Sequence, residues 1–201
     1  MNSAPIHYSR KSLPEVLKEC IQFLWCYFRS PNNIGSMIPS SDNLSKVVAK
    51  NIMNPPDALV IEIGAGTGVI TKHILEAGVK LENFFVVEYD RNLFKILEKN
   101  YKHIDNLYNI DAAKLSSELP SNTIGNVDYI ISTVPLLVVG EEKCFEILKE
   151  AKKMLKPTGV FIQVTYTPFL PKYVKDYGIR AKRTGTCCTN FPPAFVWRYQ
   201  L

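Results

Sequence analysis

The residues best suited to chemistry in this chain are a short run of glycines that follows an apolar stretch. Residues 59–63 are apolar except for Glu62. The next residues are Gly64, Ala65, Gly66, Thr67 and Gly68. Glycines at alternate positions let the backbone turn sharply and approach a ligand closely. A helical pattern begins directly afterwards, so its free N–H groups would face an anionic part of that ligand. The run therefore predicts a binding loop between a strand and a helix.

Two carboxylates further along the chain could complete this site. The apolar run Phe84–Val87 ends in Glu88. A shorter run, Leu107–Ile110, ends in Asp111. A carboxylate at the tip of the strand that follows the glycine loop is placed to accept hydrogen bonds from both hydroxyls of a ribose. The loop and Glu88 together therefore predict a nucleoside ligand.

The spacing of the glycines distinguishes between nucleoside ligands. A dinucleotide-binding fingerprint has glycine at the sixth position of G-x-G-x-x-G, where this chain has Val69. The pattern found here, with Glu62 just before it, is similar to the loop of class I methyltransferases, which bind S-adenosylmethionine. Two alternatives remain: a tight turn without a ligand, and a role for Asp111 as a loop acid only.

The resemblance to class I methyltransferases implies a role for each of these residues. The loop is expected to contact the methionine part of S-adenosylmethionine, and Glu62 to support its amino group. Glu88 is expected to hold the ribose hydroxyls, and Tyr89 to flank the adenine. Asp111 and Ala112 are expected to read the adenine amine. The full cofactor-binding set is Glu62, Gly64, Ala65, Gly66, Thr67, Gly68, Glu88, Tyr89, Asp111, Ala112 and Ser132.

The elements that must position these residues alternate along the chain. Apolar runs predict strands at 59–63, 83–88, 107–110, 127–132 and 158–165. Helical spacing predicts helices at 42–53, 68–78, 91–100 and 141–154. This alternation predicts an α/β, Rossmann-like fold, a mainly parallel sheet with helices on both faces. Short runs at 178–187 and 194–199 correspond, in methyltransferases of this class, to a terminal antiparallel pair, which makes the expected sheet seven-stranded.

The composition is that of one folded domain. A chain of 201 residues with 46% hydrophobic and 21% charged residues is expected to form a single methyltransferase domain over 1–201. The five cysteines are irregularly spaced, which predicts reduced thiols and no metal site. No secretory signal or membrane-spanning stretch is visible, so a cytoplasmic protein is expected. The net charge of +5 favours an anionic partner, either nucleic acid or an anionic membrane leaflet.

The first part of the chain does not fit the sheet pattern. Apolar residues recur at helical spacing over 12–29, and Trp25 and Tyr27 lie near the end of that stretch. An amphipathic helix is therefore predicted there, followed by an entry loop at 30–41 and a Rossmann-like core at 42–201. Two roles for the helix remain open: insertion into a bilayer surface, and a lid over the active site.

Three further segments narrow the resemblance to one family. Arg29–Ser41 follows the predicted helix and ends in a Pro-Ser-Ser run. Ser132–Leu137 reads Ser-Thr-Val-Pro-Leu-Leu, and Asn190–Ala194 reads Asn-Phe-Pro-Pro-Ala. These segments resemble the soluble bacterial phospholipid N-methyltransferases, which methylate phosphatidylethanolamine toward phosphatidylcholine. Thr133 departs from that family's pattern, in which glycine is expected, and would narrow the acceptor pocket.

The family resemblance implies an acceptor site and a membrane partner. The residues expected to position the acceptor amine are Ser132, Thr133 and Pro135. The residues expected to line the entry are Ser36, Ser40 and Asn190. The expected partners are a phospholipid substrate and an anionic membrane surface, contacted through 12–29 at the periphery of the inner membrane. His73 is interpreted as a structural or surface residue, and no general base is assigned.

Three other functions remain open. Ribosomal RNA adenine dimethyltransferases share the loop and the acids at the strand tips. Their Asn-x-Pro-Tyr or Asn-x-Pro-Phe motif supplies a carboxamide and a ring that stacks on the flipped base. The segment Ser132–Leu137 supplies neither, so nucleic acid is not the expected partner. A non-catalytic module that binds S-adenosylmethionine would keep the loop and Glu88, whereas a small-molecule amine methyltransferase would not need the aromatic helix at 12–29.

Overall fold

The computed structural model describes residues 40–169, 171–188 and 193–201. The helix predicted over 12–29 and the entry residues Ser36 and Asn190 lie outside the described residues. Ser40, the third predicted entry residue, is the first residue of the first described helix.

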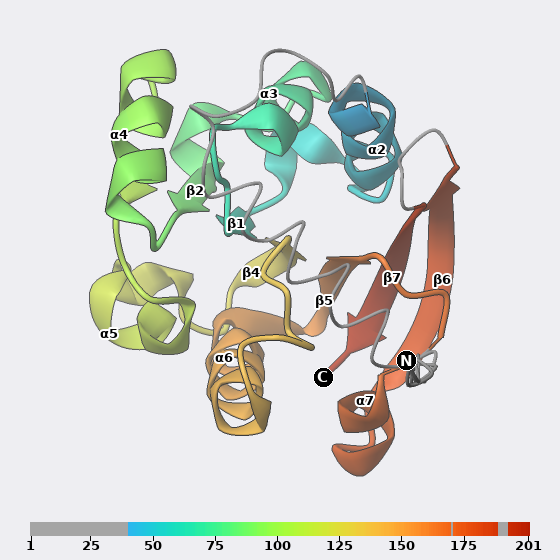
Figure 1. Cartoon of the computed structure of the whole chain (residues 1–201). Helices are drawn as coiled ribbons and strands as arrows, with labels where there is room; N and C mark the ends of the chain where they lie inside the picture. The colour runs from blue at the N-terminus through green and yellow to red at the C-terminus, as the bar shows by residue number, and fades with distance from the viewer. Residues whose placement is uncertain (1–39, 170, 189–192) are drawn as a thin grey trace, which may run out of the picture.

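A seven-stranded sheet forms the centre of the molecule, with its strands in the order β3-β2-β1-β4-β5-β7-β6 (Figure 1). The strands are β1 Val60–Ile63, β2 Phe84–Val87, β3 Leu107–Tyr108, β4 Val127–Ser132, β5 Leu155–Thr165, β6 Arg180–Cys187 and β7 Ala194–Gln200. The pairs among β1 to β5 are parallel, and β7 pairs with β5 and β6 in antiparallel fashion. This arrangement confirms the predicted sheet and its terminal antiparallel pair.

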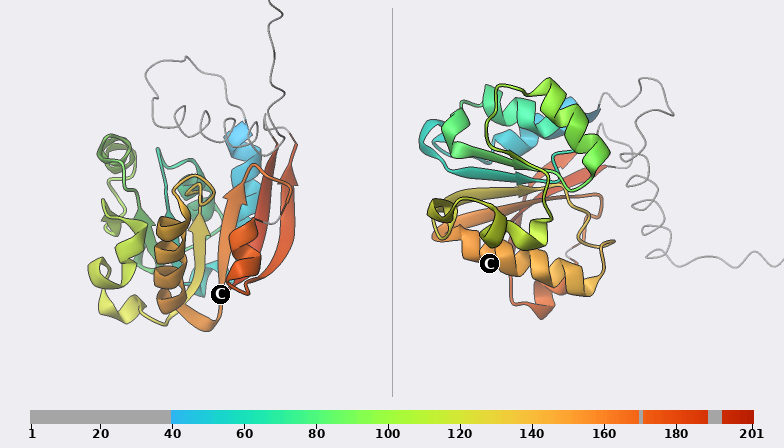
Figure 2. Two further views of the ribbon diagram at one scale, coloured as in Figure 1. Left: turned by 60° about the horizontal axis from the view of Figure 1, so that its bottom comes forward. Right: turned by 90° about the vertical axis from the view of Figure 1, so that its left-hand side faces the viewer.

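Helices cover both faces of the sheet, as predicted (Figure 2). One face carries α2 Ser40–Ala49, α3 Val69–Glu76 and α4 Arg91–Asn100. The other face carries α5 Leu115–Glu118, α6 Glu141–Met154 and α7 Lys172–Asp176. Short 3-10 turns lie at Pro55–Asp57, Leu81–Asn83, Ala112–Lys114 and Ser121–Thr123. Because side chains alternate along a strand, the sheet separates two apolar clusters, one containing Val60 and the other Ile61.

The strand β5 begins earlier than the sequence predicts. The sequence places a turn at Lys156–Gly159 and a strand from 158 onward, whereas β5 starts at Leu155, directly after α6. Leu155 lies opposite Val127 of β4, and the register shifts beyond this pair. Gly159 permits the irregularity, because a Cβ atom there would lie 2.7 Å from the Val127 carbonyl oxygen.

A buried histidine joins α2 to α3. The Nε2 atom of His73 lies 2.6 Å from Asp42 Oδ1, and its Nδ1 atom lies 2.8 Å from Glu76 Oε2. The His73 side chain is only 4% exposed, so its role is structural rather than that of a surface residue. Hydrogen bonds from Lys46 and His73 hold the pKa of the Asp42 carboxyl below its usual value. These contacts fix the helix that follows the predicted entry loop.

Candidate active site

The glycine loop joins β1 to α3 through three residues in the left-handed region of the backbone. Gly64, Gly66 and Gly68 have φ angles of 78°, 61° and 92°. A Cβ atom added at Gly66 would meet nothing within 4 Å, whereas one at Gly68 would lie 2.1 Å from Tyr101 Cε2 on the α4 side. Gly66 therefore faces open space, and Gly68 is needed for packing. Gly66 thus leaves room for a ligand, whereas Gly68 allows the loop to pack against Tyr101.

Glu88 holds the loop in place from the tip of β2. Its Oε2 atom accepts a hydrogen bond of 2.7 Å from the Gly66 N–H, and its Oε1 atom accepts one of 2.7 Å from the Asp90 N–H. Burial raises the pKa of this carboxyl above its ordinary value. A carboxylate has about four acceptor sites, so two are still available for hydroxyl donors. Glu88 thus sits beside the open face of Gly66, and its ribose-binding role stays a prediction.

Glu62 lies beneath the loop and is completely buried. Its Oε2 atom accepts a hydrogen bond of 2.7 Å from the Thr71 hydroxyl, but Oε1 has no partner among the described residues. Burial raises the pKa of Glu62 to about 8. A buried acceptor without a donor is costly and is a frequent sign of a functional site. The free oxygen suits a cationic or N–H-bearing ligand group.

Asp111 does not stand free at the tip of β3. Its Oδ1 atom accepts from the Ala113 N–H at 2.9 Å, capping the turn Ala112–Lys114, and its Oδ2 atom lies 2.6 Å from Lys143 Nζ. The hydrogen bond to Asp111 raises the pKa of Lys143. The sequence pattern does not reveal this ion pair, because Lys143 comes from α6, far along the chain.

The residues predicted to face the adenine are held in place by side-chain hydrogen bonds between β2 and β3. The side-chain amide of Asn109 donates to the carbonyl oxygens of Glu88 at 2.8 Å and Tyr89 at 3.0 Å. Tyr89 is 66% exposed, so it is accessible to a ligand, whereas Ala112 is buried. Asn109 is a positioning residue that the sequence analysis missed, because it lies inside the predicted third strand.

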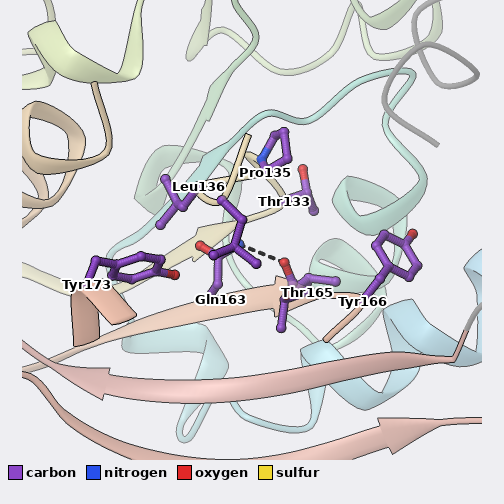
Figure 3. A pocket seen from close by; sticks show the side chains of 9 residues that line it. Thr133, Pro135, Leu136, Gln163, Thr165, Tyr166 and Tyr173 are labelled. Atoms are coloured by element: carbon purple, nitrogen blue, oxygen red, sulfur yellow. Dashed lines mark hydrogen bonds between the residues drawn. The ribbon is translucent and has the colours of Figure 1, made fainter. Parts of the chain in front are cut away.

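The predicted acceptor residues lie at the end of β4, next to the glycine loop. The Thr133 hydroxyl donates to the Gly64 carbonyl oxygen at 2.5 Å, which ties the two segments together. Ser132 is buried, and its Oγ atom has no partner within the described part of the chain. A small pocket opens beside them (Figure 3). It is lined by Thr133, Pro135, Leu136, Leu137, Gln163, Val164, Thr165, Tyr166 and Tyr173.

The fold and this site define the class of protein. A parallel sheet with a glycine loop after its first strand and a carboxylate at the tip of the second is the architecture of class I S-adenosylmethionine-dependent methyltransferases, and this chain is one of them. Residues 60–159, about half of the chain, match the family described as methyltransferase domain. The cofactor is therefore S-adenosylmethionine. The open face of Gly66, the spare acceptor sites of Glu88 and the free oxygen of Glu62 fit that cofactor.

The chain is similar in sequence to a lipid methyltransferase and to ribosomal RNA methyltransferases, and similar in fold to a solved methyltransferase structure. An ornithine lipid N-methyltransferase from Singulisphaera acidiphila is 29% identical over 77% of this chain and 81% of its own length. A ribosomal RNA small subunit methyltransferase A from Prosthecochloris aestuarii is 30% identical over 76% of this chain, which spans only 56% of that relative. A 1,6-didemethyltoxoflavin-N1-methyltransferase from Burkholderia thailandensis superposes with a TM-score of 0.63 at 11% identity, covering 98% of this chain and 94% of its own.

Two properties of the described residues bear on the expected partners. Within residues 40–169, 171–188 and 193–201, no helix is long and apolar enough to cross a bilayer. The same residues hold no group of three or more histidine, cysteine, aspartate or glutamate side chains arranged to bind a metal ion.

Proposed function

We propose that this methyltransferase acts on the amine of a lipid headgroup, with phosphatidylethanolamine and its methylated intermediates as acceptors. The observation that carries the proposal is the pocket beside Gly64, which has apolar walls formed by residues such as Pro135 and Leu136. Among the described residues that line it, none carries a charged side chain. Such a pocket favours an amine that has lost its proton, because burial disfavours the ammonium form. The ornithine lipid relative supports an amine-bearing lipid as the class of acceptor.

The residues of this chain then divide into two groups by role. The cofactor supplies an electrophilic methyl group bonded to sulfur. It is held by Glu62, Glu88, Tyr89, Asp111, Ala112 and the loop Gly64–Gly68. Ser132, Thr133 and Pro135 line the acceptor side and keep water away from the reacting nitrogen. This chemistry needs orientation and desolvation more than covalent help. The proposal also includes a membrane contact through residues 12–29, at the periphery of the inner membrane. The proposed entry to the site is lined by Ser36, Ser40 and Asn190.

Methyl transfer to lipid is the direct test. Radiolabelled S-adenosylmethionine is supplied with anionic liposomes that contain phosphatidylethanolamine or ornithine lipid, and ribosomal RNA serves as a parallel acceptor. We expect label in the methylated phosphatidylethanolamine. Label confined to ornithine lipid would keep the lipid class but change the headgroup. Label in RNA alone would overturn the proposal in favour of the runner-up, an RNA adenine methyltransferase.

Replacement of Glu88 by alanine is expected to weaken cofactor binding by about 1–3 kcal/mol, the cost of leaving polar groups without partners. The Gly66 N–H would also lose its acceptor, so the loop would be less well ordered. Calorimetric titration with S-adenosylmethionine measures the loss, and Glu82→Ala serves as a control because Glu82 is exposed in the turn before β2. Equal affinity in both variants would rule out the ribose-binding role.

A further inference from the structure

Three buried polar atoms without partners lie on three neighbouring strands. They are Ser132 Oγ on β4, Gln163 Oε1 on β5 and Trp197 Nε1 on β7. Among the described residues, Glu62 Oε1 is the one other buried side-chain nitrogen or oxygen atom without a hydrogen-bond partner. In the sheet register Ser132 lies beside Gln163, and Gln163 lies beside Trp197. Neighbouring strands are about 4.8 Å apart, so these side chains form one polar row on one face of the sheet.

Such a row destabilises an ordinary core, because each unpaired buried group costs about 1–3 kcal/mol. It lies at the carboxyl end of β4 and β5, where open α/β sheets bind their ligands. Gln163 is shared between the row and the pocket beside the glycine loop. The unmet hydrogen bonds of the row therefore belong next to the acceptor site rather than to an unrelated part of the core.

The orientation of the Gln163 amide is fixed by its own contacts. Its Nε2 atom donates to the carbonyl oxygens of Val134 at 3.0 Å and Val164 at 2.6 Å. Carbonyl oxygens can only accept, so a flipped amide would place oxygen against oxygen. The Oε1 atom must point the other way, and Figure 3 shows it on the side of the pocket where Leu136 and Tyr173 lie. The side chain is 1% exposed, so water outside the pocket does not reach it.

We propose that Gln163 Oε1 accepts a hydrogen bond from the acceptor amine, and that transfer is therefore fast only while the attacking nitrogen still carries a hydrogen. This inference rests on the proposed function. The lone pair of the amine forms the new nitrogen–carbon bond. The sulfur–carbon bond breaks at the same time, and the two electrons of that bond stay on sulfur. After the first and second transfers the methylated ammonium releases a proton to water, whereas the quaternary ammonium formed by the third transfer has none to release. A neutral primary amine has two hydrogens and a secondary amine has one, but a tertiary amine has none for Gln163.

The consequence is a built-in slow step. During the first and second transfers the attacking nitrogen can point its lone pair at the methyl group and still donate to Gln163. During the third transfer it cannot, and a buried amide oxygen is left without a donor. Loss of one such hydrogen bond lowers a rate about tenfold. The side chain of Thr133, which lines the same pocket where glycine was expected, leaves less room for a nitrogen that already carries two methyl groups.

The test compares three separate acceptors in otherwise identical anionic liposomes: phosphatidylethanolamine, its N-methyl derivative and its N,N-dimethyl derivative. For the wild-type enzyme we expect similar initial rates with the first two lipids and a rate about tenfold lower with the third. Gln163→Met keeps the length of the side chain but removes its amide, that is, both the Oε1 acceptor and the Nε2 donor to Val134 and Val164. It is expected to slow the first two transfers about tenfold and to change the third less than about threefold.

Folding and cofactor binding are measured separately from methyl transfer, so that a loss of rate can be assigned to the Gln163 side chain. Calorimetric titration with S-adenosylmethionine and thermal unfolding establish that Gln163→Met is folded and loaded with cofactor. Tyr108→Phe serves as a matched control, because Tyr108 is a partly buried residue of β3, the edge strand that three other strands separate from β5. Equal wild-type rates with all three lipids, or an equal loss in all three with Gln163→Met, would overturn the role of Gln163 alone. Failure to methylate any of the three by a cofactor-loaded enzyme would overturn the proposed function as well.

Discussion

Replacement of Glu62 by glutamine is expected to stabilise the cofactor-free protein above pH 8 and to weaken cofactor binding at least about tenfold. The pKa of Glu62 is about 8 in the folded protein, against 4.5 for an ordinary glutamate. Between these two values the folded protein keeps a proton that the unfolded chain has released. Its free energy of unfolding therefore falls as the pH rises through this window, and the penalty is complete above pH 8. Glutamine does not titrate, so the variant escapes this penalty.

The two properties are measured separately. Thermal unfolding at pH 6 and pH 9 should show a loss of stability with pH in the wild-type protein, on the order of a few kcal/mol, and a smaller loss in Glu62→Gln. Titration with S-adenosylmethionine in two buffers of different ionisation enthalpy should show proton release on binding near pH 7 in the wild type only. The same pH dependence of stability in both proteins would show that Glu62 is ionised throughout and would refute the prediction.

The second large effect concerns two glycines of the same loop. Gly66→Ala is expected to fold, with a loss of about 1–2 kcal/mol from the left-handed backbone, because a Cβ atom there has no neighbour within 4 Å. Its methyl group would occupy the open face of the loop, so cofactor affinity should fall at least about tenfold. Gly68→Ala is expected to lose more than about 3 kcal/mol of stability, because its Cβ atom would overlap the Tyr101 ring.

Gly78→Ala supplies the matched control for this pair. Gly78 has a φ angle of 100°, no neighbour within 4 Å of an added Cβ, and a place at the opposite end of α3 from the loop. It should reproduce the small stability loss of Gly66→Ala with normal cofactor binding. Thermal unfolding and calorimetric titration of the three variants decide the matter. Normal binding by Gly66→Ala would mean that its open face is not the cofactor site.

The sequence by itself determined the order and type of the main elements. The strands β1 and β2 are short apolar runs and each main helix has a clear apolar spacing, so local pattern was enough for them; the early start of β5 at Leu155 was not predicted. The loop Gly64–Gly68, with Glu88 at the tip of the next strand, was also readable, because a turn and a strand end are local features. The short helices α5 and α7 were missed, because four or five residues are too few to show a helical period.

Only the tertiary structure decided which side chains meet across the sheet. The row of Ser132, Gln163 and Trp197 depends on the register between three strands that are distant in sequence. The ion pair of Asp111 with Lys143 depends on the docking of α6. A shift of one residue in register would turn each side chain to the other face, and no local pattern specifies that register. The binding loop was therefore predictable from sequence, whereas the polar row beside the acceptor pocket was not.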